Sequence, residues 1–467
     1  MQHDQQRQRL AGPSPGWLVF WLALPVLGEQ FLNFCVGFYD TFLSGRIGPA
    51  ATAAIGLAAY VSWLAGMLFG LVGTGTTALV ARHWGAGEFE AANRATNCSI
   101  ALAVAFSGLV YGVIYTAAPG IAWLLDMDEP TRQIVVRYLR IDGVGHLFTS
   151  VSLVGAAALR GAGDMRSPLI ILGTVSVLNA AVSTVLVFGV GPWPSLGIET
   201  TWLRPLGIDG IVLGTVIARC IGGLLMLGAL ARGLSGLRLT RDEFTVRSTM
   251  AARILRIGTP AALDGLLMWC GHFLFLMVIA NLGRGRFDSV PFAAHIVGIQ
   301  VEAITYLPAV AWGYAAATMV GQSLGAGRPD RAVRAGHAAA LQCGLLAVGI
   351  SLLFYFGADR IYSIMHQAPE VQAVGAPAFR FLAWFQVPLV FSIVYVYALR
   401  GAGDTRFPML VTALGVYGVR LPGAWWCGIV LHGGLLGAWI GMVADVCVRA
   451  LLVFVRFMKG RWQAIEV

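Results

Sequence analysis

The sequence predicts an all-α membrane protein of twelve transmembrane helices arranged as two pseudo-symmetric six-helix bundles. Three observations lead to this prediction. Hydrophobic residues make up 57% of the 467 residues and charged residues 12%, against about half and about a quarter in soluble domains. The mean hydropathy is +0.74. Long apolar runs recur along the chain, and the second half repeats motifs of the first.

The repeat is clearest in one ten-residue motif. Leu159-Arg-Gly-Ala-Gly-Asp-Met-Arg-Ser-Pro168 returns 240 residues later as Leu399-Arg-Gly-Ala-Gly-Asp-Thr-Arg-Phe-Pro408. Further matches at the same shift are Gly85-Ala-Gly87 with Gly325-Ala-Gly327, Arg94 with Arg334, and Arg140 with Arg380. Several separated matches at one shift indicate a duplicated unit, and duplicated apolar bundles are typical of transporters.

Apolar runs that reach the length of a membrane span, about 20 residues, predict six spans in each repeat. They lie near 16–44, 51–82, 92–118, 131–158, 167–190, 207–231, 252–282, 290–322, 332–357, 371–398, 407–430 and 433–457. Because six is even, both copies have the same orientation. We therefore expect an N-terminal bundle at 1–231, a cytoplasmic linker at 232–251 and a C-terminal bundle at 252–467. The stretch Gly191 to Leu203 is an insertion in the first half.

The distribution of arginine predicts the orientation. Arginine and lysine gather in alternate connections and at the C-terminus, whereas the other connections are acidic. Basic loops stay in the cytoplasm. We therefore expect a multi-pass protein of the cytoplasmic (inner) membrane with both termini inside. The polar N-terminus has no cleavage site before a short apolar core, so the first apolar run is expected to be a retained span.

Composition argues against several other classes. The net charge of +9 is compatible with nucleic-acid binding, but the basic residues sit in particular loops and no basic, aromatic-interleaved domain is present. The seven cysteines all lie in apolar stretches without a Cys-x-x-Cys pair, which favours small buried side chains over metal or redox chemistry. No catalytic triad, phosphate loop or metal cluster is recognisable. We predict that the chain is not an enzyme and needs no cofactor.

The repeated ten-residue motif reads as a tight helix–turn–helix connection. Its arginine would sit in the last turn of a helix, its glycines would end that helix in the left-handed conformation, and its aspartate would cap the next one. The residues in these roles are Arg160 and Arg400, and Asp164 and Asp404, with Pro168 and Pro408 in the following first turn.

Acidic residues at membrane depth carry more functional information, because a charge there costs at least about 2.5–3.5 kcal/mol. Glu29 and Asp264 are related by the repeat, and each lies one turn after a proline, Pro25 or Pro260. Matching proline interruptions in two halves point to a transport site, and we expect hinges at both prolines. A buried carboxyl group can exchange a proton near neutrality. Coupling or substrate contact is therefore one hypothesis for these acids, and an interhelical hydrogen bond or ion pair is the other.

Asp40 lies further along the first span, where a short acidic side chain cannot easily reach water. It must face a cavity or a partner, or else cap the end of the helix. Asn179 in the fifth span lies at a similar depth. Arginines at membrane depth most simply neutralise buried acids such as Asp142 and Glu302. These arginines are Arg140, Arg219, Arg380 and Arg420.

These features resemble the multidrug and toxic compound extrusion (MATE) family, most closely its DinF-like branch. The resemblance covers essentially the whole chain. It rests on Asp40-Thr-Phe-Leu-Ser-Gly45, on Val320-Gly-Gln-Ser-Leu-Gly-Ala-Gly-Arg-Pro-Asp330 and on the doubled Leu-Arg-Gly-Ala-Gly-Asp motif. It implies two six-helix bundles facing across a central cavity, and export of organic cations and other amphipathic compounds in exchange for protons or sodium. It also implies a monomer.

The resemblance places Asp40 at the family's coupling acid, Asn179 at its helix-5 asparagine and Thr215 at a helix-6 threonine that helps to ligate sodium in some members. Asp40, Asn179 and Thr215, with Ser183, could then offer oxygen ligands to a sodium ion. Two departures matter. Ser183 stands where DinF-like members can carry a second acid, and Gln386 stands in helix 10 where NorM-like members have one. Asp264 and Glu302 would have to replace that C-terminal site.

We therefore predict a proton- or sodium-coupled antiporter that exports small organic, cationic or amphipathic compounds by alternating access. Its partners would be these substrates and membrane lipids, with no nucleic acid. The nearest alternative is a flippase of lipid-linked saccharides or another large lipid, because four membrane arginines could bind a pyrophosphate. The sequence identifies neither the substrate nor the coupling ion, although a single acid among neutral oxygens favours protons slightly.

Overall fold

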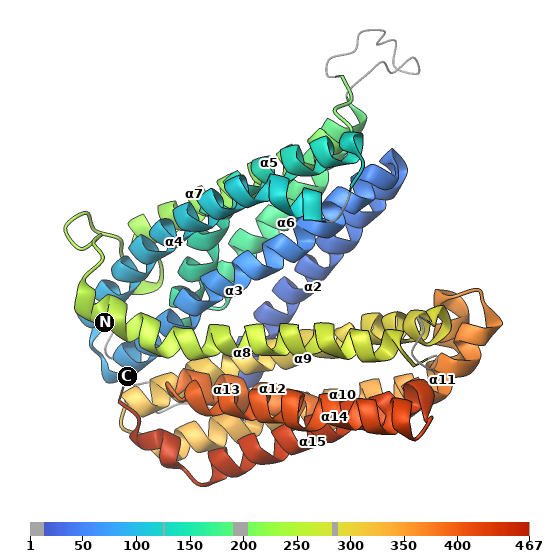
Figure 1. Ribbon diagram of the computed structural model, residues 1–467. Helices are drawn as coiled ribbons and strands as arrows, with labels where there is room; N and C mark the ends of the chain where they lie inside the picture. Colours follow the sequence, from blue (N-terminus) through green and yellow to red (C-terminus); the bar gives the residue numbers. More distant parts are fainter. Residues whose placement is uncertain (1–13, 125–126, 190–203, 283–287, 467) are drawn as a thin grey trace, which may run out of the picture. The chain divides into compact units, whose positions relative to one another are not determined.

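A computed structural model describes residues 14–124, 127–189, 204–282 and 288–466 (Figure 1). Within these ranges every regular element is helical, which confirms the predicted all-α membrane fold. The predicted insertion Gly191–Leu203 lies outside the described residues. The chain divides into two compact units. We call Gly28–Val80 with Glu88–Leu255 the N-terminal unit, and the chain up to Leu27 with Ala81–Gly87 and Arg256–Val467 the C-terminal unit.

The first half of the chain supplies six long apolar helices, each extended enough to cross a membrane. In the N-terminal unit, α5 packs against α4 and α7, and α6 packs against α7. The α6–α7 contact is close because Gly214 brings its backbone against Ser183, where a side chain would collide. The six helices are α2 (Pro15–Ile47), α3 (Pro49–Ala86), α4 (Phe89–Leu124), α5 (Glu129–Gly161), α6 (Arg166–Phe188) and α7 (Ile208–Ala231).

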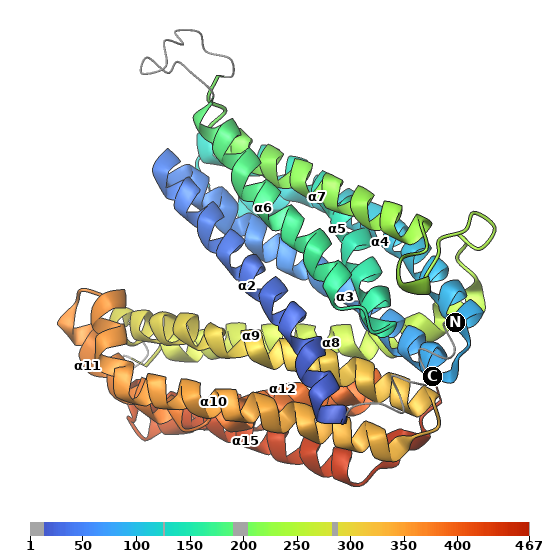
Figure 2. The same cartoon turned by 180° about the vertical axis from the view of Figure 1, so that it is seen from behind.

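The second half begins after the short helix η2 (Leu234–Gly236) and supplies the remaining spans. Figures 1 and 2 show α9, α10, α12 and α15 packed side by side, and these helices form most of the contacts of the C-terminal unit. The helices are α8 (Ser248–Ala280), α9 (Ser289–Gly325), α10 (Pro329–Met365), α11 (Pro369–Ala383), α12 (Gln386–Gly401), α13 (Arg406–Ala413), η3 (Leu414–Arg420), α14 (Leu421–Ala424), η4 (Trp425–Val430), α15 (Gly434–Met458) and η5 (Arg461–Ala464).

Two predicted spans of the C-terminal unit are less regular than expected. The span at 371–398 is broken into α11 and α12, which meet at a bend of 56°. Pro388 accounts for the break, because it has no amide proton and its ring excludes the carbonyl of Trp384. The span at 407–430 is helical throughout, but π-helical turns flank the short α14, which contains Pro422. Proline and π-turns are common causes of such irregularity.

The two copies of the ten-residue motif form the same turn, as predicted. The amide of Asp164 donates to the carbonyl of Leu159 at 2.9 Å, and that of Asp404 donates to the carbonyl of Leu399 at 2.9 Å. The glycine before each aspartate is left-handed, with φ of 89° and 90°. A hydrogen bond of this kind, from an amide to the carbonyl five residues earlier, satisfies one of the last carbonyls of a helix.

The aspartates of the two motifs differ in their partners. Asp164 caps α6 as predicted, since its side chain accepts hydrogen bonds from the amides of Arg166 and Ser167 at 3.0 and 2.9 Å. The capping role predicted for Asp404 is wrong. Its carboxylate instead accepts a hydrogen bond from Arg456 of α15 at 2.8 Å, and the start of α13 has no side-chain cap. The nearby arginine offers Asp404 a charged partner in place of backbone amides.

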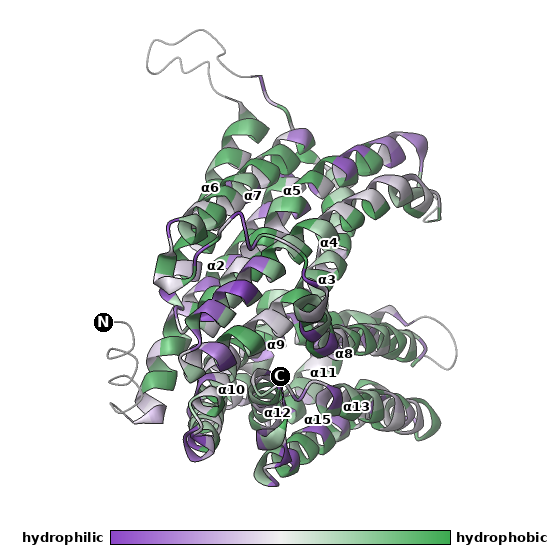
Figure 3. Ribbon diagram, turned by 90° about the vertical axis from the view of Figure 1, so that its left-hand side faces the viewer, coloured by the Kyte–Doolittle hydropathy of each residue, from purple (hydrophilic) through white to green (hydrophobic). Residues whose placement is uncertain are grey.

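The helices expose large apolar side chains along their lengths. Leu353 and Phe356 on α10 are 64% and 77% exposed, and Figure 3 shows apolar residues along the helices, with more hydrophilic ones near helix ends and connections. Apolar surface of this extent fits contact with lipid, and helices satisfy their backbone hydrogen bonds internally, as a membrane requires. The chain is a multi-pass membrane protein.

Candidate functional site

The N-terminal unit contains a cavity of about 370 Å³ among α2, α3, α5, α6 and α7. Three residues predicted from the sequence, Asp40, Asn179 and Thr215, lie on its wall. Asp142 and Arg219 also line it. Five helices thus bring two acids, one base and several neutral oxygens into one chamber. We call this chamber the Asp40 cavity.

Asp40 is the unsatisfied acid of the Asp40 cavity. One of its carboxylate oxygens, Oδ1, is buried, and no described residue donates a hydrogen bond to it. The carboxyl group faces the side chain of Asn179 and lies within electrostatic reach of Arg219. A buried carboxylate oxygen without a donor is costly, so this atom is suited to take up a proton or a cation.

Both carboxylate oxygens of Asp142, the second acid, have partners. One oxygen accepts a hydrogen bond from Arg219 at 2.8 Å. The other lies 3.2 Å from Nε2 of His146 and accepts a hydrogen bond from Ser62 at 3.2 Å. The side chain is 5% exposed. Asp142 therefore neutralises Arg219, and Asp40 remains as the acid that can change its charge.

Asn179 is held in place by Ser183, one helical turn further along α6. The Ser183 hydroxyl donates to Oδ1 of Asn179 at 2.9 Å, and Ser183 itself is fully buried. Ser183 does not line the Asp40 cavity, so it positions Asn179 without itself facing the cavity. Thr215 lines the cavity while its hydroxyl donates to the carbonyl of Ile211 at 3.0 Å. Among the described residues, no three His, Cys, Asp or Glu side chains gather closely enough to hold a metal ion.

The repeat-related acids Glu29 and Asp264 form ion pairs with the arginines of the ten-residue motif. Arg160 donates to both carboxylate oxygens of Glu29, at 2.5 and 2.7 Å. Arg400 donates to Asp264 at 2.5 Å. Neither acid lines the Asp40 cavity. Of the two hypotheses for these acids, the geometry agrees with the interhelical ion pair.

Glu302 lies on α9 in the C-terminal unit, 6% exposed. Its side chain faces Gln386 of α12, whereas Asp264 is engaged by Arg400. The described structure therefore does not join Asp264 and Glu302 into one site. Arg420 does not neutralise Glu302 directly. It pairs with Asp445 at 2.7 Å, and Arg449 pairs with the other oxygen of Asp445 at 2.8 Å.

The prediction that membrane arginines neutralise buried acids is confirmed for Arg219 and Arg420, which pair with Asp142 and Asp445. Arg380 pairs with Asp359, but that carboxylate is 68% exposed. The prediction is wrong for Arg140, whose guanidinium lies over the ring of Tyr115, 4.4 Å from its centre. Sequence reasoning also missed that Asp142 and Arg219 share a cavity with Asp40. The opposite charges of Asp142 and Arg219, both at membrane depth in the first repeat, were the signal that could have predicted this.

Comparison with known proteins identifies the family. The MatE family model matches residues 25–185 and again 260–426, so each repeat carries one copy. The chain is 27% identical to a probable multidrug resistance protein NorM of Thermotoga maritima, covering 95% of this chain and 92% of that protein. It is 26% identical to the multidrug resistance protein PmpM of Pseudomonas aeruginosa, covering 94% of this chain and 90% of that protein.

Solved structures share the fold. An outward-facing multidrug resistance MATE transporter of the MOP superfamily superposes with a TM-score of 0.87 at 20% identity, covering 98% of both chains. A MOP superfamily transporter from Pyrococcus furiosus, described as having a binding pocket of reversed polarity, superposes with a TM-score of 0.85 at 19% identity, covering 97% of this chain and 98% of that one. Both family copies, the helical fold and the full-length relatives agree: this chain belongs to the MatE family of multidrug and toxic compound extrusion transporters and is a transporter, not an enzyme.

Proposed function

We propose that this transporter exports small organic, cationic or amphipathic compounds in exchange for protons, with Asp40 as the coupling group. The observation that carries the proposal is the contrast between the two acids of the Asp40 cavity. Asp142 is neutralised by Arg219, whereas Oδ1 of Asp40 is buried and no residue in the described part of the chain donates to it. The relatives named as multidrug resistance proteins support the substrate class.

The charges of the Asp40 cavity suggest how exchange would work. Asp142 and Arg219 cancel, so the cavity carries one negative charge when Asp40 is ionised and none when it is protonated. An organic cation is attracted to the first state and released from the second. Proton and substrate would compete for one carboxylate, which is sufficient for antiport when each occupied state favours a different conformation.

The hydrogen bonds around Asn179 favour protons over sodium. Its Oδ1 already accepts a hydrogen bond from Ser183, and its side chain lies beside Asp40. Because a carboxylate only accepts hydrogen bonds, the amide nitrogen of Asn179 is the atom that could serve Asp40. A sodium ion needs several oxygen ligands, so Asn179 would have to turn its amide group to contribute one.

Conformational change is proposed to occur by rocking of two halves, with α2 bending near Pro25. A single polypeptide contains both repeats, so we expect a monomer to suffice, in the cytoplasmic membrane with both termini inside. A lipid-linked saccharide flippase is less well supported, because three of the four membrane arginines already have acidic partners.

Transport by purified protein in liposomes tests the proposal. Efflux of a fluorescent organic cation is measured under a pH gradient alone and under a sodium gradient alone. The wild type should respond to the pH gradient, and Asp40→Asn should lose that response. Asp330→Asn, the same chemical change at an exposed position in the first turn of α10, should behave as wild type. Undiminished pH-driven efflux by Asp40→Asn would remove Asp40 from the mechanism, and a response to sodium alone would overturn proton coupling.

A further inference from the structure

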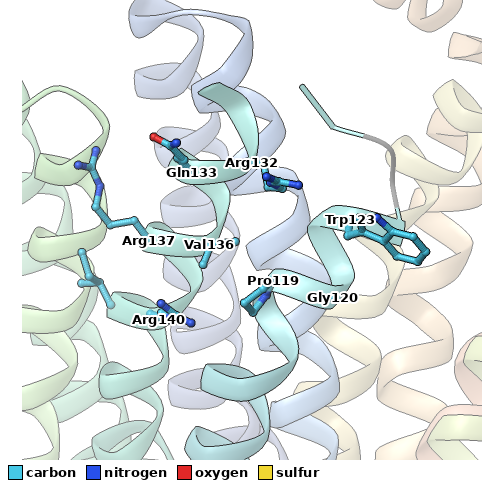
Figure 4. Close-up of a pocket in the computed structure, with 9 residues that line it drawn as sticks. Pro119, Gly120, Trp123, Arg132, Gln133, Val136, Arg137 and Arg140 are labelled. Atoms are coloured by element: carbon cyan, nitrogen blue, oxygen red, sulfur yellow. The ribbon is translucent and has the colours of Figure 1, made fainter. Parts of the chain in front are cut away.

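A second cavity lies in the N-terminal unit, where α4 ends and α5 begins. Its volume is about 710 Å³, within the range of small-molecule sites. Figure 4 shows Arg132, Arg137 and Arg140 on α5, and Pro119 and Trp123 on α4. None of its nine lining residues belongs to the Asp40 cavity, and none of them is acidic. We call it the Arg140 pocket.

Two of the three arginines of the Arg140 pocket already have acidic partners. Arg132 pairs with Glu129, and Arg137 pairs with Asp209 of α7 at 3.0 Å. Arg140 differs: its guanidinium lies over Tyr115, and its Nε donates to the Tyr115 carbonyl at 3.4 Å. No carboxylate among the described residues pairs with it. Among the residues that the structure describes, the pocket therefore carries one uncompensated positive charge.

The internal repeat shows what such an arginine normally contacts. Arg380, the counterpart of Arg140 at the shift of 240, pairs with Asp359 of α10. The register is secure, because α4 and α10 begin 240 residues apart, as do α5 and α11. The residue that corresponds to Asp359 in the first repeat is Pro119. Where the C-terminal unit supplies its own carboxylate, the N-terminal unit has a proline and an open pocket.

We propose that the Arg140 pocket binds the phosphate group of an anionic membrane lipid headgroup, in the place that Asp359 occupies in the other repeat. Guanidinium groups bind phosphate through paired, charge-assisted hydrogen bonds. The lipid is bound at the side of the transporter and is not its cargo, so the proposal does not depend on the export reaction.

The surroundings of the pocket favour a lipid over free phosphate. Trp123 on its rim is 72% exposed and the adjacent Leu124 is 77% exposed. Exposed tryptophan at a helix end is typical of the membrane interface. Pro119, Gly120 and Val136 add apolar walls. A headgroup phosphate at Arg140 would thus have apolar protein surface beside it for the glycerol and acyl chains, which free phosphate cannot use.

Lipid retention measured by native mass spectrometry tests the proposal. Purified wild-type protein is titrated with phosphatidylglycerol, with phosphatidylcholine and with inorganic phosphate. We expect retention of phosphatidylglycerol above phosphatidylcholine, and no displacement by millimolar phosphate. Arg140→Gln should weaken phosphatidylglycerol binding by about fivefold, which corresponds to the loss of one hydrogen bond of about 1 kcal/mol. Arg380→Gln removes the same charge from the repeat-related position and should leave binding unchanged.

A second pair of variants tests the same idea without removing the arginine. Pro119→Asp recreates the carboxylate of the other repeat and should displace the lipid as effectively as Arg140→Gln. Pro119→Asn is the uncharged control and should retain it. Equal losses in Arg140→Gln and Arg380→Gln, or equal binding by both Pro119 variants, would overturn the site. Full displacement by inorganic phosphate would overturn the lipid as its occupant.

Discussion

Arg160 donates hydrogen bonds to both carboxylate oxygens of Glu29, at 2.5 and 2.7 Å, and thereby ties the end of α5 to α2. The repeat-related residues Arg400 and Asp264 make the same connection between α12 and α8. The arginine of the repeated motif therefore does more than stabilise the end of its own helix. It binds the acid that lies one turn after the proline of the first helix in each repeat.

Removing the acid of either pair should destabilise the protein, and Glu29→Gln more than Asp264→Asn. The side chains of Arg160 and Glu29 are 5% and 4% exposed, against 18% and 9% for Arg400 and Asp264. Breaking a buried ion pair leaves an uncompensated charge and costs about 3–5 kcal/mol. Thermal unfolding in detergent measures the difference. The double replacement Glu29→Met with Arg160→Met should recover most of the loss, and failure to do so would contradict the charge argument.

Glycine at the third position of the motif permits close helix crossing in both repeats, but the two positions differ in available space. A β-carbon at Gly161 would lie 3.0 Å from Val80 Cβ and 3.1 Å from the Thr77 carbonyl oxygen. A β-carbon at Gly401 would overlap the backbone of Ala317. Overpacking costs about 1–3 kcal/mol, so Gly401→Ala should lower the unfolding temperature more than Gly161→Ala. Equal shifts would show that the helices can separate freely at both sites.

The sequence predicted the helical membrane fold and the turns of the repeat because both are local properties. Apolar runs determine spans, and glycine next to aspartate determines the turn that joins them. The break between α11 and α12 also has a local signal in the sequence, Pro388. The long apolar run around this proline nevertheless predicted a single unbroken span. The partner of Asp404 was not predictable from the motif, because it depends on Arg456 of a distant helix.

The Asp40 cavity was predicted only in part, for the same reason. Asp40 and Asn179 were singled out by their depth in the membrane and Thr215 by resemblance, and the structure brings all three to one cavity. The arrangement of Arg219, His146 and Ser62 around Asp142 needs α3, α5 and α7 to be placed in three dimensions. Charge balance in a membrane says that such partners must exist, but not which helices supply them.

Replacing each acid of the Asp40 cavity by asparagine should change the stability of the protein in different ways. Asp142→Asn removes the partner of Arg219 and weakens the contacts of His146 and Ser62, so the unfolding temperature should fall by the equivalent of about 2 kcal/mol or more. Asp40→Asn removes a buried charge whose Oδ1 has no donor among the described residues, so stability should stay the same or rise. This contrast is typical of functional groups held at the expense of stability. A larger loss in Asp40→Asn would assign Asp40 a structural role.

Pro25 provides the test of the hinge. It lies inside α2, and the helix passes from one compact unit to the other at Leu27–Gly28, two residues later. Proline cannot donate to the carbonyl of Trp21, so bending there breaks no hydrogen bond at that step. Pro25→Ala restores a bond of about 1 kcal/mol, which bending would have to break, so transport should slow by about fivefold.

Pro377→Ala, at an exposed proline inside α11, is the matched control and should transport at the wild-type rate. The readout is the initial rate of cation efflux from liposomes under a fixed pH gradient, together with substrate binding, which Pro25→Ala should leave unchanged. An unaltered rate in Pro25→Ala would place the bending elsewhere, and a loss of binding would show that the proline shapes the site itself.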